Sequence, residues 1–310
     1  MIKIKKAIIT GATGLIGREL VKILATNNVE VLAIIRPNSP NIGFLKSSPL
    51  LKTVECDINN LESLEKNKNL TKYDVFFHFA WQGVYGAARD DVSLQCRDIK
   101  NTLSAVKVAK KLGCAKFIGA GSQAEVGLVN EKISSNTVGN PFTAYGIAKK
   151  ASLQLAKILT EKEDMYFNWG RILSVYGPND SMHTMVMSML NKMIAGENCD
   201  LTSGEQIWDF LFSKDAAQAF YDIAKSGING KVYPVASGNG KPLKEFVLQM
   251  HKTVGNNSCK LNFGAIPFNN NSIKYLCGDT KDILADTGFK PTTAFEDGIK
   301  QTIESISHKN

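Results

Sequence analysis

Two residues with complementary proton chemistry, Tyr145 and Lys149, stand four places apart in the stretch NPFTAYGIAKKASLQLAK, residues 140–157. In a helix, residues at this spacing are neighbours on one face. The ordinary explanation of such a pair is a solvated helix face with an extended lysine. The alternative is proton transfer, because an adjacent ammonium lowers the pKa of a phenol from its usual value of about 10. A tyrosine tuned in this way could exchange a proton at neutral pH.

Three glycines, Gly11, Gly14 and Gly17, follow the first apolar run in the stretch TGATGLIG. A glycine-rich turn between a strand and a helix can accept a pyrophosphate, because no side chain blocks the backbone and helix N-terminal N–H groups face the anion. The spacing is GxxGxxG rather than the general GxGxxG. A turn made only for tight packing is the alternative. The place of the glycine stretch between a predicted strand and a predicted helix favours a dinucleotide site.

The second predicted strand ends in Arg36, where many dinucleotide sites have an acid. An Asp or Glu about 20 residues after the glycines binds the ribose 2′-hydroxyl of NAD. Here Glu30 lies at the other end of the strand, and no carboxylate follows Arg36 directly. A guanidinium can pair with a 2′-phosphate. A solvated arginine at a strand tip is the alternative, and we favour NADP(H) over NAD.

The first half of the chain alternates short apolar runs with amphipathic stretches. We expect strands at residues 5–10, 30–35, 51–56, 73–80, 115–121 and 166–175, and helices at 15–26, 91–113 and around Tyr145. Nearly continuous apolar strands that alternate with helices indicate a parallel sheet covered on both faces. The predicted fold class is therefore α/β, a doubly wound Rossmann sheet.

After about Gly177 this alternation loosens. We expect helices at 183–196, 213–227 and 242–255, with short strands at 207–212 and 231–236. These elements predict a Rossmann domain over residues 1–176 and a smaller α+β substrate lobe over residues 177–310, with segments exchanged between the two.

Composition excludes several classes of protein. The chain has 310 residues, a net charge of +8 and scattered lysines without a long basic run, so we expect no nucleic-acid partner. Its six cysteines form no CxxC pair, which argues against a zinc site or a disulfide framework and favours a reducing cytoplasm. The N-terminus does not read as a signal peptide, and no apolar run is long enough to span a membrane.

The glycine stretch together with Tyr145-x-x-x-Lys149 resembles the extended short-chain dehydrogenase/reductase superfamily, in its nucleotide-sugar epimerase/dehydratase branch. The segments VECDIN, FFHFAWQG, RILSVYGPND and FGAIPFNNNSIKYLCGDT are similar to that family's in the same order. The resemblance implies a nucleotide-diphosphate sugar as substrate and a homodimer formed through the two long helices. It assigns cofactor contacts to Gly11, Thr13, Gly14, Leu15, Ile16, Gly17, Arg36, Asp57, Ile58, Phe79, Ala80, Tyr145, Lys149 and Leu173.

The resemblance also implies catalytic roles. Ser122, five places before Gly127, stands where the family has a catalytic Ser/Thr, and Asn101 stands where a helix asparagine supports the proton relay. Tyr145 would donate the proton, Lys149 would lower its pKa and hold the nicotinamide ribose, and Ser122 would bind the carbonyl oxygen. Substrate contacts are assigned to Trp81, Ser122, Gln123, Tyr145 and Ser174, although relatives often have asparagine at the last position.

Three reactions of this branch compete. Dehydratases carry an Asp-Glu pair after the catalytic Ser/Thr, but this chain has Gln123 and Ala124, with Glu125 one place late. An NAD-dependent 4-epimerase is the alternative, although the acid that goes with NAD is missing. The segments WDFLFSKDAAQAF and FGAIPFNNNSIKYLCGDT resemble those of 4-keto-6-deoxyhexose reductases of the CDP-abequose synthase and dTDP-4-dehydro-6-deoxyglucose reductase types. We therefore expect an NADPH-dependent reductase for surface polysaccharide biosynthesis.

Two further interpretations remain open. A non-catalytic dinucleotide sensor of the same fold is the remoter alternative, since such relatives usually lack the tyrosine or the lysine. His183, after the sixth strand, stands where some related enzymes use a second acid–base for epimerisation, with a solvated loop histidine as the default. His78, within an apolar strand, is expected to be a hydrogen-bonded core residue.

Overall fold

The fold is taken from a computed structural model that describes residues 3–67, 70, 72–269 and 272–307. Asn270 and Asn271 of the segment FGAIPFNNNSIKYLCGDT, and the last three residues of the predicted lobe, lie outside the described residues.

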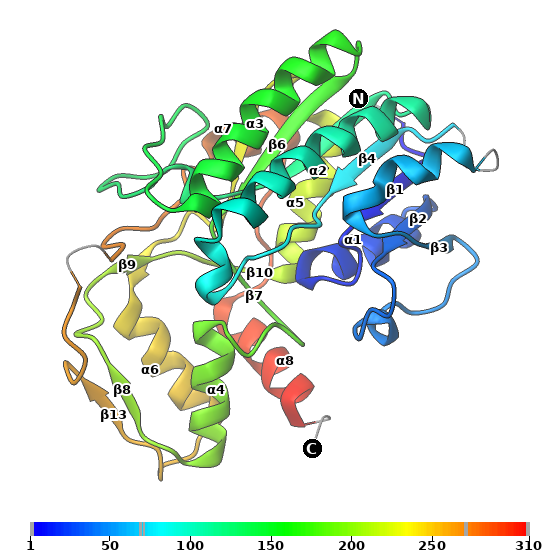
Figure 1. The fold of residues 1–310 in the computed structure, drawn as a ribbon. Coiled ribbons are helices and arrows are strands. Elements are labelled where there is room, and N and C mark those ends of the chain that lie inside the picture. Colours follow the sequence, from blue (N-terminus) through cyan, green and yellow to red (C-terminus); the bar gives the residue numbers. More distant parts are fainter. Residues whose placement is uncertain (1–2, 68–69, 71, 270–271, 308–310) are drawn as a thin grey trace.

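A seven-stranded sheet with the order β11-β6-β5-β4-β1-β2-β3 organises the molecule (Figure 1). All its strands are parallel, which confirms the predicted doubly wound Rossmann class. The strands are β1 Lys6–Thr10, β2 Glu30–Ile35, β3 Leu51–Glu55, β4 Val75–His78, β5 Lys116–Ser122, β6 Tyr166–Ile172 and β11 Val232–Val235.

Helices bury both faces of this sheet. One face packs against helices α1 Leu15–Thr26, α5 Ser213–Ser226 and α7 Lys281–Thr287. The other packs against α2 Val92–Lys111, α3 Ala144–Lys162 and the 3₁₀ segment η2 Ile58–Lys66. Because both faces are covered, the strands carry apolar side chains in both directions, as the continuous apolar runs predict.

A second lobe lies beside the carboxyl ends of the strands and contains its own apolar core (Figure 1). Its helices are α4 Met185–Ala195, α6 Leu243–Val254 and α8 Phe295–Ser307. Its strands are short and pair two by two: β7 Ser174–Tyr176 with β10 Phe210–Phe212, β8 Cys199–Leu201 with β13 Leu261–Phe263, and β9 Ile207–Trp208 with β12 Lys241–Pro242.

Two predicted strands differ from the observed ones. The expected strand 166–175 is divided at Leu173 into β6, in the main sheet, and β7, in the lobe. The expected strand 207–212 is divided at Asp209, whose buried carboxylate accepts hydrogen bonds from the backbone N–H groups of Ser237, Gly238 and Gly278. In both cases the two halves pair with different partners, so one apolar run serves two sheets.

The chain returns to the main sheet after position 177. β11 forms the edge of the sheet, in register with β6 (Val232↔Trp169, Val235↔Ile172). Pro234 lacks an N–H donor, and an edge strand tolerates it. α5 and α7 also belong to the layer that covers the sheet. The boundary between a Rossmann domain over residues 1–176 and a substrate lobe over residues 177–310 stays a prediction.

Candidate active site at the carboxyl ends of the strands

The glycine turn lies between β1 and α1, against the end of β4. Gly11 adopts φ +72°, and a Cβ there would lie 2.7 Å from the backbone nitrogen of Ala80, so only glycine fits. Gly14 precedes α1 without a side-chain cap, and the first turn of α1 carries no acid. The first N–H groups of this helix are therefore available to an anion, and the turn fits a dinucleotide pyrophosphate.

Two residues predicted to contact the adenosine half of a dinucleotide stand at neighbouring strand ends. Arg36 follows β2 and is exposed, and it forms no ion pair with any described residue. Asp57 follows β3, and its carboxylate caps η2 by accepting the N–H of Asn59 at 2.8 Å. The side chain of Arg36 is thus free to pair with a phosphate. Leu173, assigned to the cofactor, is buried in a small apolar cluster with Val126 and Ile133.

Ser122, Tyr145 and Lys149 come together where β5 ends and α3 begins. Ser122 is the last residue of β5, and the Tyr145 hydroxyl hydrogen-bonds to its side chain. Thr143 caps α3 by accepting the N–H of Gly146, which places Tyr145 in the first turn. Lys149, one turn later, donates from Nζ to the carbonyl of Ala120 at 2.8 Å. A hydroxyl donor, a phenol and an ammonium therefore face one location.

Burial controls the proton chemistry of this group. Burial raises the pKa of Tyr145 to about 12, against the opposing effects of the Ser122 hydrogen bond and the charge of Arg89. Burial also lowers the pKa of Lys149 to about 7, against the nearby carboxylates of Glu125 and Asp98. The net shift of the Tyr145 pKa is upward, opposite to the one expected from a lysine neighbour, because desolvation outweighs the Ser122 hydrogen bond and the charge of Arg89.

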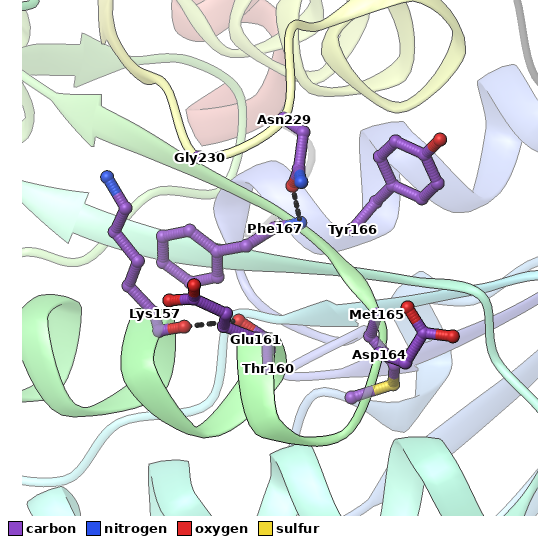
Figure 2. Close-up of a pocket in the computed structure, with 9 residues that line it drawn as sticks. All are labelled: Lys157, Thr160, Glu161, Asp164, Met165, Tyr166, Phe167, Asn229 and Gly230. Carbon is purple, nitrogen blue, oxygen red and sulfur yellow. Dashed lines mark hydrogen bonds between the residues drawn. The ribbon is translucent and has the colours of Figure 1, made fainter.

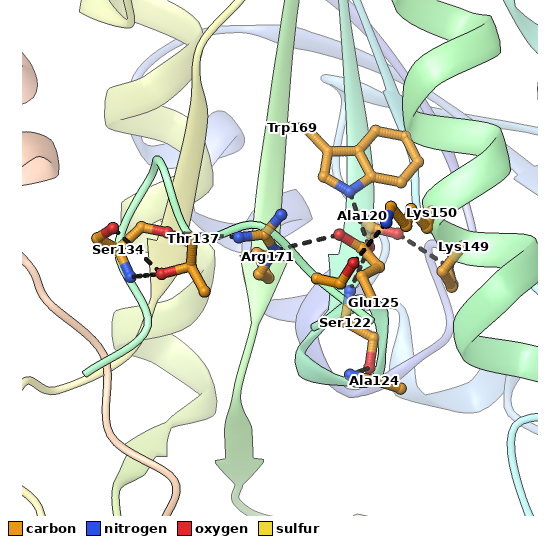
Figure 3. A network of polar contacts seen from close by, with 11 residues as sticks. Ala120, Ser122, Ala124, Glu125, Ser134, Thr137, Lys149, Lys150, Trp169 and Arg171 are labelled. Carbon is orange, nitrogen blue, oxygen red and sulfur yellow. Dashed lines mark hydrogen bonds and ion pairs between the residues drawn. The ribbon is translucent and has the colours of Figure 1, made fainter. Parts of the chain in front are cut away.

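A buried carboxylate, Glu125, supports the end of β5 (Figure 3). Its Oε1 accepts the backbone N–H of Ser122 at 2.8 Å and the indole N–H of Trp169 at 2.9 Å. Its Oε2 pairs with Arg171 Nε at 3.2 Å. Gly121 makes room for this arrangement, since a Cβ there would lie 2.1 Å from Trp169 Nε1. Glu125, expected only as an acid one place late for a dehydratase, forms a local capping box with Ser122, while its other two partners, Trp169 and Arg171, lie more than 40 residues away.

The segment after β4 covers the lysine. The Nζ of Lys149 lies 3.6 Å from the centre of the Trp81 ring, a cation–π contact. The indole N–H of Trp81 donates to Gln95 Oε1 at 3.0 Å, and its ring meets Tyr145 edge-on at 6.0 Å. Trp81, predicted as a substrate contact, is thus placed against the catalytic candidates, while Phe79 and Ala80 lie beside the glycine turn.

Asn101 is not bonded to the Ser122–Tyr145–Lys149 group. It is buried in α2, and its amide donates to Asn59 Oδ1 at 3.0 Å and to Asp98 Oδ1 at 3.2 Å. Its role in a proton relay stays a prediction.

Two of the four histidines, His78 and His183, were singled out from the sequence, and they differ in burial as expected. His78 is buried, hydrogen-bonded to the hydroxyls of Thr10 and Thr102, with a pKa lowered to about 3 by burial, which confirms a core residue. His183 is an exposed loop residue whose ring lies 5.8 Å from that of Tyr85.

Ser174 connects the site to the second lobe. Its hydroxyl accepts the indole N–H of Trp208 at 3.0 Å, which connects β7 to β9. Gln123 follows Ser122 directly, begins the short 3₁₀ segment Gln123–Glu125 and is partly exposed.

One pocket lies away from the Ser122–Tyr145–Lys149 group. A pocket of about 440 Å³ at the amino end of β6 is lined by polar residues including Lys157, Glu161 and Asn229 (Figure 2). Since Ser122 pairs with the last residue of β6, this pocket is at the opposite end of that strand. A second pocket, of about 290 Å³, lies beside α1.

Within the described ranges, no cluster of His, Cys, Asp or Glu side chains is arranged to hold a metal ion. Over the same ranges, no helix combines the length and apolar character needed to cross a membrane.

The family model of the NAD dependent epimerase/dehydratase family matches residues 7–236. The chain is 25% identical over 306 residues to the CDP-abequose synthase of Salmonella typhimurium, covering 96% of this chain and 97% of that protein. It is 29% identical over 247 residues to the dTDP-6-deoxy-L-talose 4-dehydrogenase (NAD(+)) of Aggregatibacter actinomycetemcomitans, covering 77% and 87%. The structure of a UDP-N-acetylglucosamine 4-epimerase from Methanobrevibacter ruminantium M1 superposes with a TM-score of 0.88 at 21% identity, covering 100% of both chains.

Proposed function

Since the chain belongs to the NAD dependent epimerase/dehydratase family, we propose that it is an NADPH-dependent reductase of nucleotide-linked 4-keto-6-deoxyhexoses. The substrate class is exemplified by dTDP-4-dehydro-6-deoxyglucose, and the product is the 4-hydroxy sugar used for surface polysaccharide. Similarity to a CDP-abequose synthase over nearly the full length of both chains supports this assignment. The observation that carries it is the convergence of Ser122, Tyr145 and Lys149 without a carboxylate at positions 123 and 124.

The residues of this chain have distinct tasks in the proposed reaction. The dinucleotide, when bound, supplies the hydride. The Ser122 hydroxyl donates a hydrogen bond to the ketone oxygen and stabilises the negative charge that grows there. Tyr145 delivers its hydroxyl proton to the same oxygen, so that an alcohol forms. Lys149, fixed by the Ala120 carbonyl and the Trp81 ring, places a positive charge near the phenolate that Tyr145 becomes when it gives up its proton.

The choice of cofactor rests on Arg36. Its exposed guanidinium at the end of β2, free of any ion pair with a described residue, favours NADP(H). The similar talose dehydrogenase carries NAD(+) in its name, so the two cofactors must be compared directly.

The test is an absorbance assay of the purified chain. With dTDP- or CDP-4-keto-6-deoxyglucose we expect consumption of NADPH, and slower consumption of NADH. No consumption with either cofactor and any such ketone would refute the reductase. Interconversion of a 4-hydroxy sugar nucleotide with its 4-epimer, without net consumption of cofactor, would instead establish the 4-epimerase. A chain that binds NADPH but catalyses neither reaction would be the dinucleotide sensor.

We also propose a homodimer formed through α2 and α3. On α3, Ile147, Leu155 and Ile158 are apolar yet 53%, 43% and 52% exposed, and their spacing places them along one side of the helix. The change Ile158→Glu should convert the dimer into a monomer in light scattering. Ile228→Glu, at a similarly exposed residue on a loop, should not. We place the protein in the cytoplasm.

A further inference from the structure

We propose that Arg89 is a positioning residue for the proposed reduction, a second cation that supports proton transfer at the Tyr145 hydroxyl. This inference rests on the function proposed above. The guanidinium carbon of Arg89 lies 4.5 Å from the centre of the Tyr145 ring, within the range of a cation–π contact. Arg89 comes from the segment between β4 and α2, whereas Lys149 comes from the helix that carries Tyr145 itself. The phenol is therefore approached by cations from two separate elements.

Hydrogen bonds hold this segment against both α2 and α3. The buried amide of Gln95 donates to the carbonyls of Gly83 and Ala88, at 3.0 and 2.9 Å. The Asp90 carboxylate accepts the N–H of Ala144, the residue before Tyr145, at 3.1 Å. Because the residues on both sides of Arg89 are fixed, its position over the ring is set by the fold.

Arg89 donates a hydrogen bond from its guanidinium to the carbonyl of Val84 at 3.3 Å. It forms no ion pair with any described carboxylate. Its charge is therefore not neutralised by a partner. As a side-chain type, the arginine guanidinium is not deprotonated in proteins. Lys149 differs, because burial lowers its pKa to about 7 and its Nζ lies 5.9 Å from the Tyr145 ring centre. Above neutral pH, Arg89 is thus the lasting positive charge beside the phenol.

The other groups around Tyr145 do not replace it. They are the hydroxyls of Ser122 and Tyr85, the carboxylate of Glu125, the ammonium of Lys149 and the indole of Trp81. Glu125 disfavours the phenolate, but Arg171 pairs with it directly. Removing Arg89 removes a charge that favours the phenolate, so the pKa of Tyr145 should rise and the phenol should become a weaker acid.

The test compares Arg89→Met, Arg89→Lys and the matched control Arg97→Met, whose arginine is exposed on α2. In Arg89→Met we expect kcat for the ketone to fall about tenfold and KM to stay within about twofold. Arg89→Lys keeps a cation over the ring and should restore part of kcat, and Arg97→Met should match the native chain. An unchanged kcat, a defect confined to KM, or no recovery in Arg89→Lys would overturn the proposal.

A second measurement needs no turnover. The ultraviolet absorbance of tyrosinate is titrated in the native chain and in Tyr145→Phe, and the difference isolates Tyr145. The same difference is then taken in the Arg89→Met background. Because burial already raises the pKa of Tyr145 to about 12, the tyrosinate fraction is compared at one alkaline pH at which circular dichroism shows both chains to be folded. A smaller fraction in the Arg89→Met background supports the proposal, and an equal or larger fraction refutes it. If the native chain reduced no ketone, the proposed function would fail while this titration would still decide whether Arg89 acts on the phenol.

Discussion

The main sheet and the second lobe are built on different scales. The strands of the sheet run from four residues in β4 to seven in β5 and β6, whereas those of the lobe have two or three. Long parallel strands bring their carboxyl ends to one edge, and the Ser122–Tyr145–Lys149 group lies there. The short pairs of the lobe depend on helices and aromatic packing around Phe210, Phe246 and Phe295.

This difference indicates a division of labour. The sheet edge positions the reacting groups, while the lobe contributes contacts such as that between Trp208 and Ser174. Substitutions at the edge should therefore change the rate of the chemical step, and substitutions in the lobe should change stability or substrate affinity.

The sharpest comparison uses two buried tyrosines, one from each region. Tyr145→Phe should lower kcat by about 10²- to 10⁴-fold, because the proton donor is lost. The dissociation constant for NADPH, measured by fluorescence titration, should stay within about twofold, since the glycine turn is untouched. Tyr176→Phe in the lobe removes only a hydrogen bond to the carbonyl of Phe295 at 3.1 Å. It should cost about 1 kcal/mol of stability and leave kcat nearly unchanged. Equal losses of kcat in Tyr145→Phe and Tyr176→Phe would contradict the proposal that the sheet edge, and not the lobe, positions the reacting groups.

The next effect concerns the support of the sheet edge. Glu125→Ala leaves the buried guanidinium of Arg171 without its partner, so the free energy of unfolding should fall by about 3–5 kcal/mol. Glu125→Gln keeps an acceptor for Ser122 and Trp169 and should lose less. Chemical denaturation monitored by circular dichroism measures both. An unchanged free energy of unfolding in Glu125→Ala would show that this network of hydrogen bonds does not hold β5 in place.

A smaller effect is expected where β2 meets the cofactor. Arg36→Ala should raise KM for NADPH about tenfold to a hundredfold, because a charge-assisted hydrogen bond to the 2′-phosphate is lost. KM for NADH should not change. Lys52→Ala, at an exposed residue of the neighbouring strand β3, serves as the control. A parallel rise in KM for both cofactors would argue against NADP selectivity at this position.

The smallest effect belongs to the lobe. Trp208→Phe removes the indole donor to Ser174 and keeps most of the apolar volume. Steady-state kinetics should show a few-fold rise in KM for the sugar nucleotide, in keeping with one lost hydrogen bond. A fall in kcat with constant KM would instead place this contact in the chemical step and weaken the comparison.

The sequence predicted the sheet much better than the lobe. Helix α1 and strand β2 have the predicted bounds, because long periodic runs between glycine and polar residues leave little freedom. The run 207–212 was expected to be one strand. It is interrupted at Asp209, whose partners Ser237, Gly238 and Gly278 lie far along the chain, and no local pattern indicates them.

The site shows the same limit. The resemblance to the short-chain dehydrogenase/reductase superfamily grouped Ser122 with Tyr145 and Lys149, and the three lie together where β5 ends and α3 begins. No sequence pattern indicates a role for Arg89, since its position over Tyr145 depends on hydrogen bonds made by its neighbours rather than on a motif. The upward pKa shift at Tyr145 was missed for a related reason: it follows from burial, and spacing does not report burial.

The late return of β11 to the sheet has a consequence for biosynthesis. As the chain leaves the ribosome, β6 emerges more than 50 residues before its outer neighbour, with α4 and α5 translated in between. During that interval the nascent sheet presents an open hydrogen-bonding edge, the kind of surface on which polypeptides associate wrongly. Any pause in translation between the two strands would prolong the exposure, so the speed of elongation over this stretch bears directly on how much of the protein is recovered in soluble form.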